Sequence, residues 1–209
     1  MGINAASLFP MFLKLEGRNC LVLGAGSVGE QKIRSLLDCG ARIRVVAPFA
    51  SAAVIEWANR GVLTWLQREF ESADLDGIFL VIAATSSVDV NHEIYREAQA
   101  RGILCNVVDD PPHCDFYYPA VVRRGQLQIA ISTAGLSPAL AQRIRKQLEG
   151  EFPPAYANWL EELGSRRESL FRAGGDAEVR RKLLHHLATR EAFMEFVRSP
   201  QSESGKEIL

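Results

Sequence analysis

The sequence has few cysteines, and none of them is arranged as a pair that would suggest a zinc site. Its four cysteines, Cys20, Cys39, Cys105 and Cys114, show no CxxC spacing, and three of them lie in or beside apolar runs. Single cysteines in apolar surroundings are typical core residues of a reduced protein. We therefore expect neither a disulfide framework nor a zinc cage.

The chain also lacks long hydrophobic runs and a surplus of either charge. Nowhere are there 18 consecutive apolar residues, and no basic segment followed by an apolar stretch of signal length opens the sequence. The formal net charge is −1, whereas non-specific nucleic-acid binding needs a basic surplus. We expect a soluble, cytoplasmic protein that binds neither membranes nor nucleic acids.

What is present, from about residue 18 to 108, is an alternation of short apolar runs with amphipathic stretches. Strands are expected at 19–24, 41–48, 61–67, 77–85 and 103–109, and helices at 27–40, 51–59 and 87–102. Strands that are apolar on both faces are typical of a parallel sheet covered by helices on both sides. The pattern predicts an α/β fold of the Rossmann type.

The rhythm changes after residue 115. Residues 117–133 predict a hairpin of two strands joined at Arg124-Gly125, followed by a helix over 137–150. Residues 152–199 are helical and charge-rich, with a break at "AGGD" (173–176), and the last ten residues have the composition of a disordered tail.

A glycine-rich turn follows the first predicted strand. Gly24, Gly26 and Gly29 in "LGAGSVGE" have GxGxxG spacing and open a helix, as the dinucleotide fingerprint requires. Gly24 would allow the tight turn, Gly26 the approach of a pyrophosphate, and Gly29 the close packing of helix on strand. This context favours nucleotide binding, although a tight turn in a sheet without a cofactor could use the same glycines.

The second strand lacks the acidic residue that would hold a ribose 2′-hydroxyl. Ala47 and Pro48 stand there, and we expect them to line the cofactor although neither side chain can bind a hydroxyl. Arg42 and Arg44 on the same strand could meet a 2′-phosphate or could face solvent. The residues alone leave NAD and NADP open.

The stretch "NVVDDPPHCDFYYPA" (106–120) ends the predicted Rossmann half. Asp109 follows a buried strand at the carboxyl edge of the sheet, where ligands bind in open α/β folds, and could act as a general base or as a turn carboxylate. We expect Asp109 and Asp110 to lie in extended backbone with only Asp109 facing the cleft. No helix is expected to begin at Asp110, because Pro111 follows it.

A permanent metal site is not expected in this stretch. His113, Cys114 and Asp115 are consecutive and cannot readily converge on one ion, and no second ligand motif is near in the sequence. The other histidines, His92, His185 and His186, lie on predicted helices, where we expect surface or packing residues.

Three stretches taken together carry a resemblance. "GAGSVGEQKIRSLLDCGARIRVVAP", "AATSSVDVN" and "NVVDDPPHCDFYYPAVVRRGQLQIAISTAGLSPALAQRIRKQLE" resemble, in this order and spacing, the siroheme-synthase N-terminal family. The resemblance is close over about residues 8–150 and loose over the helical tail. Members of that family are precorrin-2 dehydrogenases, and some are also sirohydrochlorin ferrochelatases.

The resemblance implies a division of the chain. We expect an NAD-binding Rossmann domain at 1–115, a small α+β dimerisation segment of hairpin and helix at 116–150, a C-terminal helical domain at 151–199 and a disordered tail at 200–209. In this family homodimers form by exchange of the middle segment.

The resemblance also implies site residues. Asp109 would be catalytic. The cofactor would contact the following residues: Gly24, Ala25, Gly26, Ser27, Val28, Gly29, Ala47, Pro48, Ala84 and Thr85. Arg143, Lys146 and His113 are candidates for binding the carboxylates of precorrin-2, with a solvated helix face as the alternative for the two cations.

The activity implied is NAD-dependent oxidation of precorrin-2 to sirohydrochlorin, with insertion of Fe²⁺ as an open second activity. An NAD- or tetrapyrrole-binding module without turnover could use the same scaffold, but it would not need Asp109. A generic reductase of a small substrate is disfavoured, because no Tyr-xxx-Lys pair follows the Rossmann half.

Overall fold

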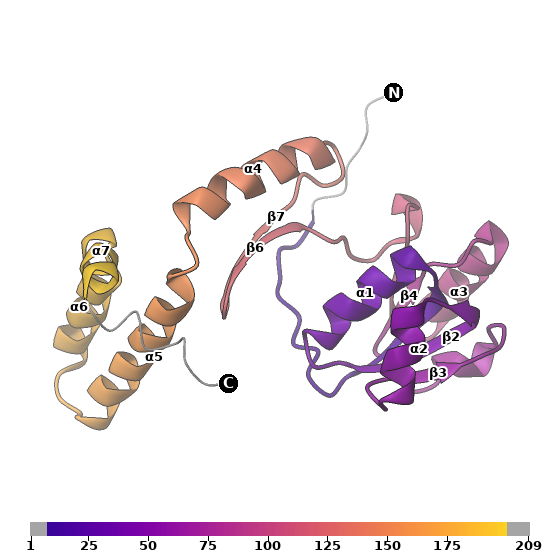
Figure 1. Ribbon diagram of the computed structural model, residues 1–209, viewed down its shortest axis with the longest axis horizontal. Coiled ribbons are helices and arrows are strands. Elements are labelled where there is room, and N and C mark those ends of the chain that lie inside the picture. The colour runs from indigo at the N-terminus through magenta and orange to yellow at the C-terminus, as the bar shows by residue number, and fades with distance from the viewer. Residues whose placement is uncertain (1–7, 200–209) are drawn as a thin grey trace. The chain divides into compact units, whose positions relative to one another are not determined.

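The computed structural model describes residues 8–199 and divides them after Tyr118 into two compact units. The first unit has five strands: β1 (Asn19–Ala25), β2 (Arg42–Ala50), β3 (Thr64–Leu66), β4 (Leu80–Ala83) and β5 (Leu104–Val107). All neighbours pair in parallel, in the order β3-β2-β1-β4-β5. Figure 1 shows this unit in indigo to pink. The predicted Rossmann-type sheet is confirmed.

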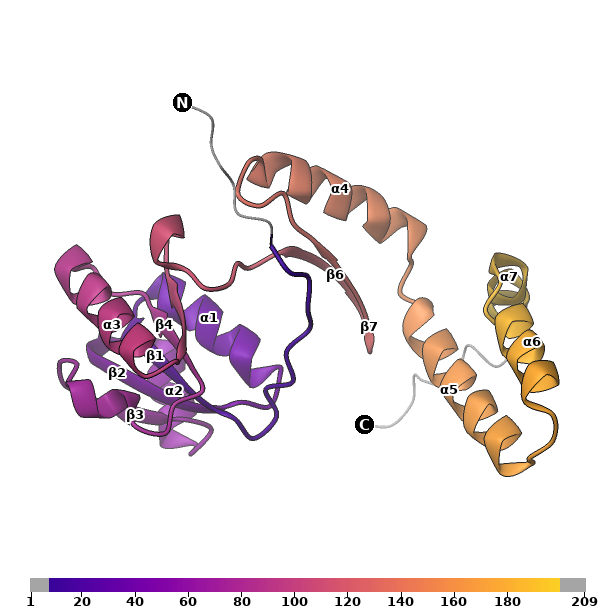
Figure 2. The same cartoon turned by 180° about the vertical axis from the view of Figure 1, so that it is seen from behind.

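Helices cover both faces of this sheet. They are α1 (Ser27–Leu37), α2 (Ala52–Asn59) and α3 (Val88–Ala100), with 3₁₀ turns η1 (Ser72–Leu75) and η2 (Pro111–His113). Side chains alternate between the faces: Val22 packs with Ile33 of α1 and Val54 of α2, whereas Leu23 packs with Ile94 of α3. Figure 2 shows the same unit from behind.

One strand is longer than the sequence indicated. β2 continues past Pro48 to Ala50, because Ala50 pairs with Ala25 after a register shift in β1. Proline has no N–H for the ladder and is tolerated at such an irregularity. The strand expected at 41–48 from the apolar residues therefore ended two residues too early.

The second unit begins with a hairpin and a helix. β6 (Ala120–Arg124) and β7 (Leu127–Ile131) pair antiparallel, and α4 (Pro138–Glu151) packs on them. The Arg124 guanidinium donates to the backbone oxygens of Phe152 and Glu149 at 2.6 and 3.1 Å, which ties the hairpin to the end of the helix. The predicted turn at Arg124-Gly125 is confirmed, with Gly125 at φ +56°.

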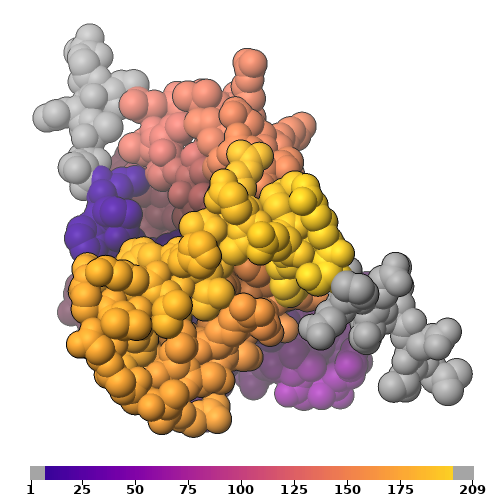
Figure 3. Space-filling view, turned by 90° about the vertical axis from the view of Figure 1, so that its left-hand side faces the viewer, coloured from indigo at the N-terminus to yellow at the C-terminus, as the bar shows by residue number. Residues whose placement is uncertain are grey.

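Three more helices follow within the described part of this unit: α5 (Tyr156–Arg172), α6 (Ala177–Leu187) and α7 (Arg190–Arg198). Their core is aromatic, with Phe193 of α7 5% exposed against Tyr156 and Trp159 of α5. Figure 3 shows these helices in orange to yellow. The break at "AGGD" is confirmed, but a second break, capped by Thr189, was not foreseen.

The predicted division into three domains stays a prediction. The predicted disordered tail at 200–209 lies outside the described residues. Within residues 8–199, no helix is both long enough and apolar enough to cross a membrane.

Candidate functional site

The glycine-rich turn joins β1 to α1 at the carboxyl edge of the sheet. Gly24 has φ +93°, and a Cβ there would lie 2.3 Å from the backbone oxygen of Ala84. A Cβ on Gly29 would lie 2.1 Å from the oxygen of Gly24. A Cβ on Gly26, by contrast, would meet no described atom within 4 Å. The protein's own packing therefore requires Gly24 and Gly29, whereas Gly26 leaves open space above the turn.

The first turn of α1 offers free donors to that space. Gly26 is the N-cap and contributes no side chain, and its oxygen accepts the first helical hydrogen bond, from the N–H of Glu30, at 2.8 Å. The N–H groups of Ser27, Val28 and Gly29 have no acceptor among residues 8–199. Unpaired N–H groups at the positive end of a helix dipole form an anion site. The turn fits the pyrophosphate of a dinucleotide.

The other predicted cofactor residues lie at the same edge. Ala47 is buried, and its oxygen accepts a hydrogen bond from the Trp65 indole at 3.0 Å, while Pro48 beside it is exposed. After β4, the Thr85 hydroxyl lies 2.8 Å from Oδ1 of Asn91, whose amide donates to the Thr85 backbone oxygen at 3.2 Å. Asn91, only 8% exposed, thus fixes the turn that carries Ala84 and Thr85.

The two arginines of β2 do not lie at this edge. Arg42 begins the strand, paired with Asn19 at the start of β1, about 16 Å of strand before Ala47. Arg44 approaches the backbone oxygen of Asp74, at 3.4 Å. The fold therefore gives neither guanidinium access to a 2′-phosphate on the ribose side.

Asp109 lies in a turn directly after β5. Its φ is +60°, so the extended backbone that we expected is wrong; aspartate is among the few residues that tolerate the left-handed region. Its side chain is exposed, and no described residue donates a hydrogen bond to its carboxylate. A free carboxylate thus stands at the carboxyl edge of the sheet.

Lys32 of α1 is the cation whose charge is coupled to Asp109. Burial lowers the pKa of Lys32, and the negative charge of Asp109 opposes this shift. Its Nζ lies 3.6 Å from the centre of the Tyr118 ring. Sequence reasoning missed this lysine, because the residues near it lie far along the chain, on the loop after β5.

The loop after Asp109 is held firmly against the unit. The Asp115 carboxylate accepts hydrogen bonds from the Cys105 N–H at 2.8 Å and from the Gln99 amide. The buried Asn106 amide donates to the Phe116 oxygen at 2.8 Å. A short helical turn, η2, does begin after Asp110, contrary to expectation, because Asp110 is a non-helical N-cap and Pro111 takes the first helical position.

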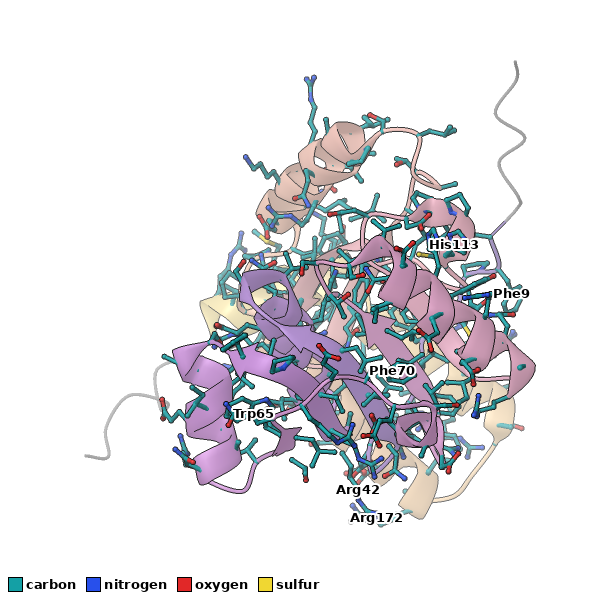
Figure 4. All side chains as sticks on the ribbon, turned by 90° about the vertical axis from the view of Figure 1, so that its right-hand side faces the viewer. Phe9, Arg42, Trp65, Phe70, His113 and Arg172 are labelled. Atoms are coloured by element: carbon teal, nitrogen blue, oxygen red, sulfur yellow. The ribbon has the colours of Figure 1, made fainter. Side chains whose placement is uncertain are left out.

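Two histidines meet on Asp110 within this arrangement. Oδ2 of Asp110 lies 2.7 Å from Nε2 of His92 and 2.8 Å from Nδ1 of His113. The hydrogen bonds from His113 and His92 hold the pKa of Asp110 below its usual range. The expectation that His92 is only a surface or packing residue was therefore wrong, since α3 brings it to the loop. Figure 4 shows His113 at the opposite end of the sheet from Arg42.

The consecutive residues beside His113 take no part in that cluster. Asp115 is used as described above, and the Cys114 thiol donates to the oxygens of Val107 and Asp110 at 3.1 and 3.3 Å. His113, Cys114 and Asp115 thus diverge, as their adjacency predicted. Burial raises the pKa of the Cys114 thiol, so it is a structural donor rather than a thiolate.

The predicted substrate cations lie on α4 in the second unit. Arg143 and Lys146 are both exposed, and neither forms an ion pair with a residue that the structure describes. Their neighbour Arg145 is instead paired with Glu149. A role in substrate binding stays a prediction for both.

Comparisons with known proteins agree with this architecture. Residues 11–120, more than half of the chain, match the family described as "Putative NAD(P)-binding", and residues 124–151 match the "Sirohaem biosynthesis protein central" family. The first match confirms the predicted cofactor, NAD, at the level of an NAD(P)-binding domain.

Curated relatives are siroheme synthases. That of Photorhabdus laumondii is 43% identical over 76% of this chain and 34% of its own length. Siroheme synthase 1 of Aeromonas hydrophila is 35% identical over 96% of this chain and 46% of its own length. The chain thus spans between a third and a half of these relatives.

A solved structure matches nearly the whole chain. It is described as "SirC, precorrin-2 dehydrogenase", and it superposes with a TM-score of 0.79 at 29% identity, over 91% of this chain and 94% of that one. The parallel sheet, the glycine turn, the two family matches and this superposition lead to one assignment. The chain belongs to the siroheme-synthase N-terminal family.

Proposed function

We propose that the protein oxidises precorrin-2 to sirohydrochlorin with NAD⁺ as the oxidant. The observation that carries this proposal is the carboxylate of Asp109, exposed and without a donor among the described residues, at the same sheet edge as the glycine turn. A module that only bound a dinucleotide would have no use for it. The solved relative described as a precorrin-2 dehydrogenase supports the choice of substrate.

The oxidation removes two hydrogens from precorrin-2, one as a hydride and one as a proton. The chemistry that NAD⁺ supplies when bound is acceptance of the hydride. The N–H groups of Ser27, Val28 and Gly29 would hold its pyrophosphate, and Gly26 leaves the room for it.

The proton is the part of the reaction that falls to the protein. Asp109 can take it as a general base, because its carboxylate is exposed and carries no hydrogen bond that would have to be broken first. The negative charge of Asp109 in turn favours the protonated form of Lys32, against the effect of burial.

Insertion of Fe²⁺ into sirohydrochlorin is a second candidate activity. It releases two protons from the pyrrole nitrogens as the ion enters, and the free carboxylate of Asp109 is able to accept them in turn. The ferrous ion would be a substrate of this step.

The test is anaerobic incubation of the purified protein with precorrin-2 and NAD⁺, following NADH and the sirohydrochlorin spectrum. Asp109→Asn is the variant of choice, because asparagine tolerates the positive φ at this position and removes only the charge. We expect the rate to fall by about 10²- to 10⁴-fold with NAD⁺ binding retained. Fe²⁺ is added only after oxidation is complete, and siroheme formation faster than the spontaneous reaction would establish the second activity.

Asp38→Asn is the matched control. Asp38 is an exposed carboxylate at the C-terminal end of α1. The helix starts at the carboxyl edge of the sheet, so Asp38 lies near the opposite edge, away from Asp109. It should turn over like the unmodified protein. Absence of turnover by the unmodified protein, despite NAD⁺ binding, would refute the dehydrogenase and leave a binding module.

We further propose that the protein acts as a homodimer formed through the hairpin and α4. A two-stranded hairpin is marginally stable alone, and this one pairs with no further described strand. The apolar side chains of Leu136 and Leu140 beside it are 63% and 49% exposed. A second copy would cover them.

A further inference from the structure

His92, Asp110 and His113 form a cluster that neither the dinucleotide turn nor Asp109 uses. His92 lies in the second turn of α3, and the other two lie on the loop after β5. One ligand atom from each of the three lies within 4.8 Å of those from the other two. Their side chains are 37%, 26% and 31% exposed, so that an ion could reach them from solvent.

The chemistry of the three groups selects one class of ion. Two imidazoles and one carboxylate are ligands for divalent first-row transition metals, whereas Mg²⁺ and Ca²⁺ prefer sites made of oxygen. Donor atoms bound to one such ion at ordinary bond lengths lie about 3 Å apart. The observed 2.7 and 2.8 Å around Oδ2 of Asp110 are close to that spacing, so a slight outward rotation of the side chains would admit an ion.

The cluster is held in place by contacts that do not use its ligand atoms. The ring of Tyr95 packs edge-on against that of His113, with the ring centres 4.9 Å apart. The backbone N–H of His113 donates to the backbone oxygen of Asp110 at 3.0 Å. Asp115 fixes the end of the same loop to β5 through the Cys105 N–H. The ligands therefore lie on a supported loop and a helix rather than on a free segment.

A carboxylate that bridges two imidazoles by hydrogen bonds is the competing explanation. Both histidines form a hydrogen bond with Oδ2 of Asp110. Within the described part of the chain, Oδ1 of Asp110 and the other nitrogen of each ring have no hydrogen-bond partner. Neutral imidazole can move its proton to the other ring nitrogen, so both facing nitrogens can present lone pairs without a change of charge. The second carboxylate oxygen and the outer ring nitrogens are thus still unpaired, and the cluster is open to solvent. These features favour an ion site over a closed hydrogen-bond network.

We propose that His92, Asp110 and His113 bind one divalent transition-metal ion in an exchangeable site next to Asp109. The site does not depend on the proposed oxidation, since it needs neither NAD⁺ nor a tetrapyrrole. Water would fill the remaining coordination positions of the ion, as it does in catalytic metal sites, whereas structural metal sites are closed by protein ligands.

The experiment uses the full chain, freed of metals with a chelator and titrated with Co²⁺ while its visible absorption is recorded. Zn²⁺ and Mg²⁺ are titrated separately by calorimetry. We expect one Co²⁺ per chain, tighter binding of Zn²⁺ than of Co²⁺, and no heat from Mg²⁺. His92→Asn, His113→Asn and Asp110→Asn should each weaken Zn²⁺ binding by about 100-fold or more, because loss of a supporting contact alone costs 10- to 100-fold.

The chain offers a matched control in its two other histidines. His185 and His186 lie on α6 in the second unit, and the double variant His185→Asn/His186→Asn should bind Zn²⁺ unchanged. Circular dichroism of each variant checks that the fold is intact, and Asp110→Asn keeps a residue that suits the N-cap of η2.

Three results would overturn the proposal. They are an unchanged Co²⁺ titration in the folded His92→Asn and His113→Asn variants, loss of binding in the His185/His186 control, and intense near-ultraviolet bands from cobalt bound to a cysteine thiolate. Because precorrin-2 and NAD⁺ are absent from this experiment, a failure to bind metal would not refute the proposed oxidation. A failure of the oxidation assay would likewise not refute the metal site.

Discussion

At the scale of single residues, the three glycines of the turn separate what the fold needs from what a ligand needs. Gly26→Ala should leave the free energy of unfolding within about 1 kcal/mol, because its φ of −74° is ordinary and only its N-cap preference changes. It should weaken NAD⁺ binding by at least about tenfold, because the added methyl group projects into the space above the helix N-terminus.

Gly24→Ala is the comparison, and it should destabilise the first unit by several kcal/mol. Its Cβ would lie 2.3 Å from the Ala84 oxygen, at a φ that only glycine adopts readily. Urea unfolding and calorimetric NAD⁺ titration measure both effects. Equal loss of stability in the two variants would contradict the division of roles.

The same residues show what the sequence could and could not predict. Spacing identified the glycines, because a turn between a strand and the next helix is a local feature. His92 could not be assigned, since its partner Asp110 is 18 residues further on, on another element. The position of His92 near the start of a helix, at the edge where the loop after β5 also lies, was the available signal.

At the scale of elements, the 3₁₀ turn η1 depends on one buried carboxylate. Asp74 is 4% exposed, its two oxygens accept hydrogen bonds from Arg68 at 2.7 and 2.8 Å, and one of them also accepts from the Glu71 N–H at 3.0 Å. The hydrogen bonds from Arg68 hold the pKa of Asp74 below its usual range, against the opposing effect of burial. Asp74→Asn should cost about 1–3 kcal/mol of unfolding free energy near neutral pH, less than for a fully buried pair, because Arg68 is partly exposed.

The cost of that substitution should depend on pH in one direction. A carboxyl whose pKa is lower in the folded state stabilises the protein fully above its unfolded pKa, about 3.9, and this stabilisation is lost as the pH falls through the folded value. The difference between Asp74→Asn and the unmodified protein should therefore shrink below about pH 4. Urea unfolding measures it in a Trp159→Phe background, where the fluorescence comes from Trp57 and Trp65, with Asp38→Asn as the exposed control. A difference that stays constant or grows towards acid pH would be inconsistent with this role.

Elements were predicted best where one local pattern decided them. The apolar runs of the parallel strands and the amphipathic stretches between them placed strands and helices to within a few residues. In the structure Ser51, Ser87 and Ser137 are the N-caps of three of these helices. The break before α7 was missed although Thr189 accepts a hydrogen bond from the Ala192 N–H, because a lone threonine within a charged helical pattern is a weak signal. The turn at 108–113 was misjudged for a physical reason: hydrogen bonds to β5 and α3 fold it back, and these are tertiary contacts.

At the scale of the whole molecule, the hairpin and α4 are the part that a single chain leaves incomplete. The unpaired edges of a two-stranded sheet and the exposed side chain of Leu140 favour association with a second copy. We expect a homodimer by light scattering after size-exclusion chromatography. Leu140→Glu should raise its dissociation constant by about 100-fold or more, because a carboxylate would have to be buried in the interface.

The control for that substitution lies on the same helix. Gln142→Glu adds the same charge two residues along α4, about 200° around the helix from Leu140, where the side chain is also exposed. It should leave the dimer intact, and NAD⁺ should bind the Leu140→Glu monomer as it binds the dimer, since the glycine turn lies wholly within the first unit. A monomeric unmodified protein would refute the dimer itself. A dimer that survives Leu140→Glu would instead move the interface to another surface.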